Sequence, residues 1–280
     1  MKLPNFGYHL ARAQGHAIRA AYNAALERII ARRINIMGAV SFDVCSYSGS
    51  AMLAEQVASI RSFLHHAGRP RCFTVYSDGS HSALEIDILR CVDPSVEVQI
   101  VPSLPTNLVG EVAAYLDVHP TGKQLRLMMS LPLERPTLYV DSDVLFFRGA
   151  AAIESIVSST TAAALFLQDC QLSADERVFR RTDERSHPVN TGMILFNRKL
   201  DWAAALERLR QLNGAPIFHT NQTLTHVVML ANRAAPLDPR KFVLQLDDQF
   251  VYRDRYARGD IVARHYVNPV RHKFWTAVLR

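Results

Sequence analysis

The sequence predicts an α/β protein with a mixed, mostly parallel β-sheet that is flanked by helices and preceded by an N-terminal helix. Two observations support this prediction. Between residues 39 and 101, three apolar runs rich in β-branched and aromatic residues alternate with two segments of helical pattern. Single helices between strands are typical of βαβ units, which build parallel sheets. The chain is also long enough, at 280 residues with 49% hydrophobic composition, to bury a full core.

Residues 1–37 are predicted to form a basic helical segment. They contain six lysines and arginines against one glutamate, whereas the rest of the chain is nearly neutral. Ile18, Tyr22 and Ile29 recur at helical spacing, so the helix has an apolar side. Two interpretations stay open: the helix lies on an anionic membrane surface, or it packs on the flank of the domain. Nucleic-acid binding is not expected, because the basic residues are not interleaved with stacking aromatic residues.

Residues 38–280 are predicted to form a single domain. Its strands are expected near residues 39–49, 71–79, 95–101, 137–147, 162–170 and 192–197. Its helices are expected near residues 51–66, 82–91, 122–131, 150–158, 202–212 and 222–231. The charged loop 175–185 joins the last two strands and is either a solvated face or a lid over a site. A polar and aromatic tail ends the chain.

The cytoplasm is the expected location. No stretch reaches the roughly 18 consecutive apolar residues of a spanning helix, and the N-terminus lacks a compact apolar core followed by a cleavage site. The four cysteines form no CxxC pair, which disfavours a zinc site and a secreted disulfide framework. Because the N-terminal helix is basic, we also expect peripheral contact with the inner face of the membrane.

Polar residues close the first two predicted strands. Ser46 and Tyr47 lie at the end of the first strand, and Asp78 lies in the Ser-Asp-Gly turn after the second. Parallel sheets bind their ligands beyond the carboxyl ends of the strands. These three residues are therefore candidate ligand contacts, although Asp78 alternatively serves only to form the turn.

Two carboxylates stand in one of the most apolar runs of the chain, Thr137–Phe147. On a strand, Asp141 and Asp143 point to the same side with their Cα atoms roughly 7 Å apart. A carboxylate in an apolar place costs several kcal/mol unless a partner is present, so a shared cation is expected. The alternative is that Asp143 caps a turn and Asp141 pairs with an arginine.

Four sequence blocks occur in an order that resembles a known family. They are LYVDSDVLFF (residues 138–147), VNTGMILFNR (189–198), TNQTLTH (220–226) and RHYVNPVRHKFW (264–275). Together they resemble the DxD strand, the Asn-x-Gly strand, the Asp-Gln helix start and the C-terminal histidine segment of nucleotide-sugar glycosyltransferases of the GT-A fold. The resemblance is greatest to glycosyltransferase family 8 and its bacterial relatives, and it implies a GT-A, Rossmann-like sheet.

The resemblance implies roles for individual residues. Asp141, Asp143 and His265 would hold a divalent metal on the donor's diphosphate, with His272 as the alternative histidine. Further contacts to the donor nucleotide and sugar are implied for Ser46, Tyr47, Asp78, Lys123, Ser142, Asn190, Gly192, Arg271 and Lys273. Asp169 and Gln222 are the polar groups expected on the face of the transferred sugar.

Two departures from the family pattern bear on these assignments. Asn221 stands where the family usually has aspartate, which alters one polar contact near the sugar. In the last block, Asn268 holds the place of a glycine and Arg271 that of a lysine, while Lys273 comes two residues later. Either Arg271 or Lys273 is therefore the basic residue that meets the diphosphate.

The activity implied is metal-dependent transfer of a sugar from a nucleoside diphosphate sugar, with a UDP-sugar expected and retention of anomeric configuration. Mn²⁺ is expected to activate better than Mg²⁺, because a nitrogen ligand suits it better. The acceptor is a glycan, a lipid-linked molecule or a protein. Two alternatives stay open: an inactive binding protein of the same fold, and a haloacid dehalogenase-like phosphatase, whose Asp-x-Asp motif normally opens the domain.

Overall fold

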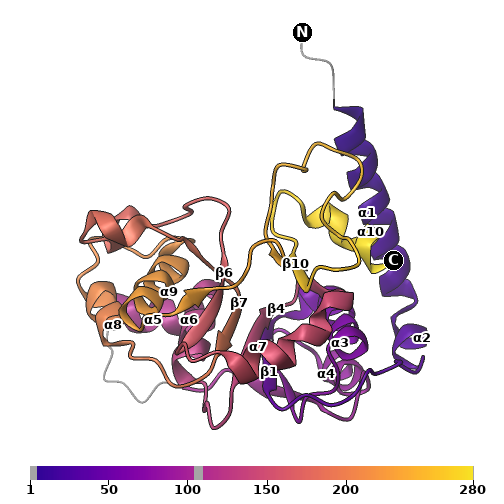
Figure 1. Cartoon of the computed structure of the whole chain (residues 1–280), viewed down its shortest axis with the longest axis horizontal. Helices are drawn as coiled ribbons and strands as arrows, with labels where there is room; N and C mark the ends of the chain where they lie inside the picture. Colours follow the sequence, from indigo (N-terminus) through magenta and orange to yellow (C-terminus); the bar gives the residue numbers. More distant parts are fainter. Residues whose placement is uncertain (1–4, 104–109, 280) are drawn as a thin grey trace.

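A seven-stranded mixed β-sheet organises the computed structural model, which describes residues 5–103 and 110–279 (Figure 1). The strand order is β3-β2-β1-β4-β7-β6-β8, and β7 runs antiparallel to both β4 and β6. All other pairs in this sheet are parallel. The strands are β1 (Asp43–Ser48), β2 (Phe73–Ser77), β3 (Val96–Ile100), β4 (Thr137–Asp141), β6 (Ala164–Gln168), β7 (Val189–Phe196) and β8 (Ala235–Pro236). The predicted fold class is confirmed.

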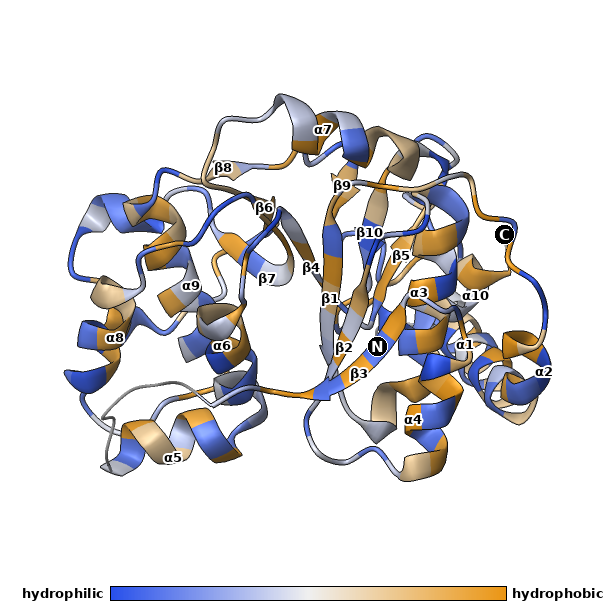
Figure 2. Cartoon of the chain, turned by 90° about the horizontal axis from the view of Figure 1, so that it is seen from below, coloured by the Kyte–Doolittle hydropathy of each residue, from blue (hydrophilic) through white to orange (hydrophobic). Residues whose placement is uncertain are grey.

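Helices cover both faces of this sheet because the central strands, such as β4 and β7, are apolar on both sides. Leu138 and Val140 of β4 join one buried cluster, whereas Tyr139 between them joins the other. The first cluster packs under α3 (Leu53–His66), α4 (Ala83–Arg90) and α7 (Ile153–Ser159). The second packs under α5 (Gly110–Val118), α6 (Pro120–Ser130), α8 (Ala203–Arg210) and α9 (Thr220–Ala231). Figure 2 shows α5, α6, α8 and α9 to the left of the strands and α3 and α4 to their right.

A second, three-stranded sheet has the order β5-β10-β9. Its strands are β5 (Val144–Phe146), β9 (Phe242–Val243) and β10 (Ala263–His265). The prediction of one strand over 137–147 is wrong: β4 ends at Asp141, the chain turns, and β5 enters this second sheet. The apolar run does not reveal the break because the residues of β5 are as buried as those of β4.

The C-terminal segment is folded against the rest of the chain. In β10, His265 pairs with Val144, and the Tyr266 N–H donates to the Asp143 carbonyl at 2.9 Å. Helix α10 (Phe274–Val278) follows. The sequence pattern did not predict β8, β9, β10, α5 or α10. The strands are only two or three residues long, and the apolar residues of α5 run consecutively, so neither shows a clear period.

The N-terminal segment forms α1 (Phe6–Ala24) and α2 (Leu26–Ile30), while residues 1–4 of the predicted segment lie outside the described part. Helix α1 lies along α10, as both views show (Figures 1 and 2). The rings of Tyr22 and Trp275 pack against each other in a tilted arrangement, with their centroids 5.0 Å apart. A Cβ at Gly15 would lie 2.2 Å from the His272 carbonyl oxygen, so only glycine permits this approach. No helix in the described residues is both long and apolar enough to cross a membrane.

Candidate active site

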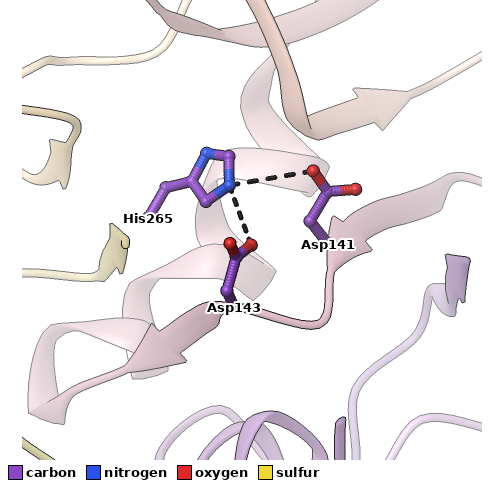
Figure 3. Close-up of side chains that lie close together, drawn as sticks. All are labelled: Asp141, Asp143 and His265. Atoms are coloured by element: carbon purple, nitrogen blue, oxygen red, sulfur yellow. Dashed lines mark hydrogen bonds and ion pairs between the residues drawn. The ribbon is translucent and has the colours of Figure 1, made fainter. Parts of the chain in front are cut away.

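Three side chains from two distant segments converge at the end of β4. One ligand atom from each of Asp141, Asp143 and His265 lies within 4.8 Å of the others (Figure 3). The His265 Nε2 atom is 3.0 Å from the Asp143 Oδ1 atom and 3.7 Å from the Asp141 Oδ2 atom. Asp141 ends β4, Asp143 lies in the turn before β5, and His265 ends β10, which pairs with β5 beside that turn. The two sheets meet at this cluster.

Hydrogen bonds orient the imidazole of His265. The Asn190 Oδ1 atom accepts from the Gly192 N–H at 2.9 Å, which fixes the amide so that its oxygen faces His265 Nδ1, also at 2.9 Å. The ring therefore carries its hydrogen on Nδ1 and donates it to Asn190. The Nε2 atom is left to face the two carboxylates, as a metal ligand must.

Gly192 makes room for this ring. A Cβ atom at position 192 would lie 2.0 Å from His265 Cε1 and 2.3 Å from Nδ1. Real Cβ atoms do not approach that closely, so any other residue displaces the imidazole. The Asn-x-Gly pattern thus supplies both the acceptor and the space for His265.

A chain of hydrogen bonds holds Asp141 from the opposite side. Its Oδ1 atom accepts from the Tyr139 hydroxyl at 2.7 Å and from the Gln124 amide at 3.0 Å. The Gln124 Oε1 atom in turn accepts from Asn221 Nδ2 at 2.7 Å. Because Gln124 spends its amide hydrogens on Asp141 and Tyr139, its oxygen needs a donor, which an asparagine at 221 supplies and an ionised aspartate does not.

The pKa values of the two carboxyl groups in the cluster are shifted in opposite directions. Burial raises the pKa of Asp141 to about 6, and the neighbouring Asp143 charge adds to this, against the opposing effect of His265. Burial also disfavours the Asp143 anion, but His265 and Arg271 outweigh it and hold the Asp143 pKa below its ordinary value. Burial lowers the basicity of His265, yet the Asp143 carboxylate raises the His265 pKa overall. The two carboxylates thus require positive charge close by, which His265 and Arg271 provide in this structure.

Arg271 supplies the cation nearest to Asp143. Its Nη2 atom donates to the Asp143 Oδ2 atom at 2.6 Å, and its side chain is 41% exposed. A guanidinium with this much exposure can turn toward a phosphate while one end stays at the cluster.

A second set of hydrogen-bonded polar side chains surrounds Asp169. The Asp169 Oδ2 atom accepts from Asn190 Nδ2 at 3.2 Å and from Gln222 Nε2 at 3.3 Å. Gln222 also donates to the Ser173 carbonyl at 3.0 Å. The two predicted sugar-contacting residues, Asp169 and Gln222, are thus brought together. Asn190 links them by hydrogen bonds to His265.

These residues line one cavity of about 490 Å³, a size that suits a small-molecule ligand. Most of the predicted site residues contribute to its wall. They are Tyr47, Asp141, Ser142, Asp143, Asp169, Asn190, Gln222, His265 and Arg271.

The remaining predicted residues do not line this cavity. Ser46 is fully buried, and Gly192 lies behind His265. The Asp78 carboxylate accepts from the Ser80 N–H and hydroxyl, as in the turn interpretation.

Both predicted lysines are held elsewhere. Lys123 donates to the Asp78 carbonyl at 2.8 Å. Lys273 is 1% exposed, and its ammonium is held by the carbonyls of Asp248, Val251 and Arg253 and by the Asp248 carboxylate, 3.1 Å away. Of the two basic residues considered for the diphosphate, only Arg271 reaches the cavity.

Sequence reasoning missed Gln124 and Tyr139 as supports of Asp141. Tyr139 stands two residues before Asp141, so a strand places both on one side, and that spacing was an available signal. Gln124 and Asn221 are far apart in the sequence, and no pattern within the chain links them.

The donor set fits a divalent cation. Two carboxylates and one imidazole nitrogen on one side leave the other side open to the cavity for a ligand's oxygens. Hard divalent ions accept such oxygens, and Mn²⁺ also accepts imidazole.

The seven-stranded, mostly parallel sheet flanked by helices matches the fold of GT-A glycosyltransferase structures. The chain is similar to the crystal structure of the galactosyltransferase LgtC in complex with donor and acceptor sugar analogs, with a TM-score of 0.53, 13% identity, and coverage of 85% of this chain and 95% of LgtC. It is similar to mouse xyloside xylosyltransferase 1, with a TM-score of 0.52, 13% identity, and coverage of 82% and 99%. At these identities the likeness shows the fold.

A longer protein also matches. The bifunctional glycosyltransferase WbbM has a TM-score of 0.55 and 12% identity, with 89% of this chain covering 51% of WbbM. No family model matches the chain, and no curated protein matches it.

Proposed function

We propose that this protein is a metal-dependent glycosyltransferase that moves a sugar from a nucleoside diphosphate sugar to an acceptor. The observation that carries the proposal is the Asp141, Asp143 and His265 cluster at the edge of a cavity in a GT-A fold. The glycosyltransferase names of the similar structures support it.

The bound cation would neutralise the diphosphate and so make it a better leaving group. Arg271 adds positive charge at the same phosphates, where charge develops as the glycosidic bond breaks. Tyr47, at the end of β1, lines the cavity where the nucleoside is proposed to lie. Asp169 and Gln222 hold the hydroxyl groups of the donor sugar and orient its anomeric carbon.

More specific proposals about the metal ion and the donor follow from the same site. Mn²⁺ is the proposed ion because one ligand is a nitrogen, and a UDP-sugar transferred with retention is the proposed donor chemistry, by likeness to family 8. The acceptor is a glycan, a lipid-linked molecule or a protein.

The cytoplasm, with peripheral contact at the inner face of the membrane, is the proposed location. The membrane contact is supported by the basic N-terminal segment and by Phe6 and Leu10, whose exposed fractions are 73% and 60%. Basic helices with exposed apolar residues bind anionic membrane surfaces.

A coupled assay for released UDP, run over a panel of UDP-sugars, tests the proposal. The parent should release UDP with Mn²⁺ and not with a chelator. His265→Ala should raise the Mn²⁺ requirement by roughly tenfold or more, the usual cost of losing a metal contact.

The alternatives have different signatures in that assay. A phosphatase would release inorganic phosphate from simple phosphate esters, and an inactive binding protein would bind a UDP-sugar without releasing UDP. Release of UDP that is independent of the metal would contradict the proposal. The fold does not favour the phosphatase.

A further inference from the structure

A second cavity, of about 500 Å³, lies between α1 and the C-terminal segment and adjoins the first. Met52, Asn268 and Arg271 line both cavities. Arg271 stands at the boundary, because its Nη2 atom contacts Asp143 while the side chain also lines the second cavity. The two cavities therefore meet at these three residues, and Arg271 connects the second cavity to the cluster of Asp141, Asp143 and His265.

Helix α1 builds the outer wall of this cavity. Tyr8, Arg12, Gly15 and Arg19 lie on one side of the helix and line the cavity. The wall is held in place by specific contacts: Tyr8 packs edge-on against His272 with ring centroids 5.3 Å apart, and Arg19 pairs with the buried Glu55 at 2.6 Å. The cavity is thus a product of close packing between the two ends of the chain.

The charges in the lining do not balance. The Arg19 charge is compensated by Glu55 and the Arg271 charge by Asp143. Within residues 5–103 and 110–279, Arg12 has neither an ion pair nor a side-chain hydrogen bond. The cavity therefore carries one unpaired guanidinium at its solvent-exposed rim, and the exposed His16 beside it adds a further potential donor.

The boundary also holds a buried donor without an acceptor. Among the described residues, the Arg271 Nε atom is buried and has no hydrogen-bond partner. Leaving such a donor unpaired costs about 1–3 kcal/mol, which a shift of the Arg271 side chain toward an oxygen acceptor in the cavity would recover. Tyr8, Met52 and Trp275 provide apolar surface next to these cationic groups. The ligand that matches this lining has an anionic oxygen group and a less polar body.

We propose that this second cavity is the acceptor subsite and that it binds a phosphate group carried by the acceptor. Guanidinium groups match phosphate oxygens in charge and geometry, and Arg12 presents an unpaired one to this cavity, with the Asp143-bound Arg271 at its boundary. The donor's own phosphates belong at the metal cluster in the first cavity, so the donor does not need this second site. The assignment to the acceptor rests on the proposed glycosyltransferase function; the phosphate site itself rests on the cavity.

Calorimetric titration of the metal-free protein, residues 1–280, with inorganic phosphate tests the site. Chloride at equal ionic strength provides the baseline. The parent should bind phosphate saturably, and Arg12→Ala should bind it at least tenfold more weakly, while Arg12→Lys should retain part of the affinity. Arg28→Ala removes an exposed arginine of the same basic segment that does not line the cavity, and it should bind as the parent does. Equal affinities of Arg12→Ala and Arg28→Ala, or no saturable binding to the parent, would overturn the site.

Vesicles of equal parts phosphatidylglycerol and phosphatidylcholine distinguish the two sources of the phosphate. Arg12-dependent binding to these vesicles that inorganic phosphate displaces supports a lipid-linked acceptor. Arg12-dependent phosphate binding that the vesicles do not compete supports a soluble phosphorylated acceptor. Neither measurement uses a sugar donor, so a protein that binds phosphate through Arg12 but releases no UDP would contradict the proposed function and not the phosphate site.

Discussion

At the scale of single residues, the position of His265 depends on the absence of a side chain at Gly192. We predict that Gly192→Ala displaces the imidazole and weakens Mn²⁺ binding in the presence of UDP by roughly 10–100-fold, the usual cost of disturbing a ligand's support. Titration of Mn²⁺ by electron paramagnetic resonance measures this. Gly259→Ala is the matched control, because a Cβ there meets no atom within 4 Å. Unchanged Mn²⁺ affinity in Gly192→Ala would remove His265 from the metal site.

The sequence allowed the three residues of the candidate metal site to be predicted but not the residues that hydrogen-bond to them. Asp141 and Asp143 stand out because two carboxylates in an apolar run need a partner. His265 came from the resemblance of its segment to a family. Gln124 and Asn221 were not predicted as a pair, because their hydrogen bond joins two helices whose packing no local pattern encodes. Lys273 was predicted to contact the donor, but its ammonium is buried among three carbonyl groups and a carboxylate. Nothing in the local sequence indicates this burial.

At the scale of elements, the charged loop 175–185 is tied to α8 by an ion pair. The Glu184 carboxylate accepts two hydrogen bonds from Arg208, at 2.7 and 2.9 Å, and both side chains are 12% exposed. This contact fixes one end of the loop to the main body. The loop is therefore anchored at this point. The sequence alone left open whether this loop is a solvated face or a lid over a site.

The same ion pair predicts a pH dependence of stability. The hydrogen bonds from Arg208 lower the pKa of Glu184 to about 2 from an ordinary value of 4.5. A lowered folded-state pKa contributes stability that is present above the unfolded pKa and is lost as the pH falls toward the folded pKa. We expect Glu184→Gln to lower the free energy of unfolding near pH 7 by on the order of 2 kcal/mol, and the difference from the parent to shrink by about half near pH 3. Urea unfolding at the two pH values measures it. A difference that is the same at both would rule out this origin.

The turn between β4 and β5 shows why element boundaries escape the sequence. Both strands are buried, so the apolar run is continuous while the chain leaves one sheet for another. The predicted convergence of Asp141 and Asp143 is confirmed, although a turn and not strand alternation brings them together, and the shared cation stays a prediction.

At the scale of the whole molecule, the two ends of the chain pack together. Tyr22 of α1 contacts Trp275 of α10, and Ile18 packs against the same cluster. We predict that Tyr22→Ala lowers the free energy of unfolding by about 2 kcal/mol, a fraction of the cost of removing a fully buried aromatic ring. Phe6→Ala, at a position 73% exposed on the same helix, should change it little. Equal stability of the parent and Tyr22→Ala would mean that α1 does not hold the C-terminal segment.

Both sheets and the C-terminal segment contribute residues to the proposed metal site, which calorimetric titration with UDP in the presence and absence of Mn²⁺ tests. The parent and Asp87→Ala, which removes an exposed aspartate of α4, should bind UDP strongly only when Mn²⁺ is present. Asp143→Ala should lose the Mn²⁺-dependent part of this binding while its thermal unfolding remains cooperative. Binding of UDP by a folded Asp143→Ala variant with the same Mn²⁺ dependence as the parent would contradict the assignment of this cluster as the metal site.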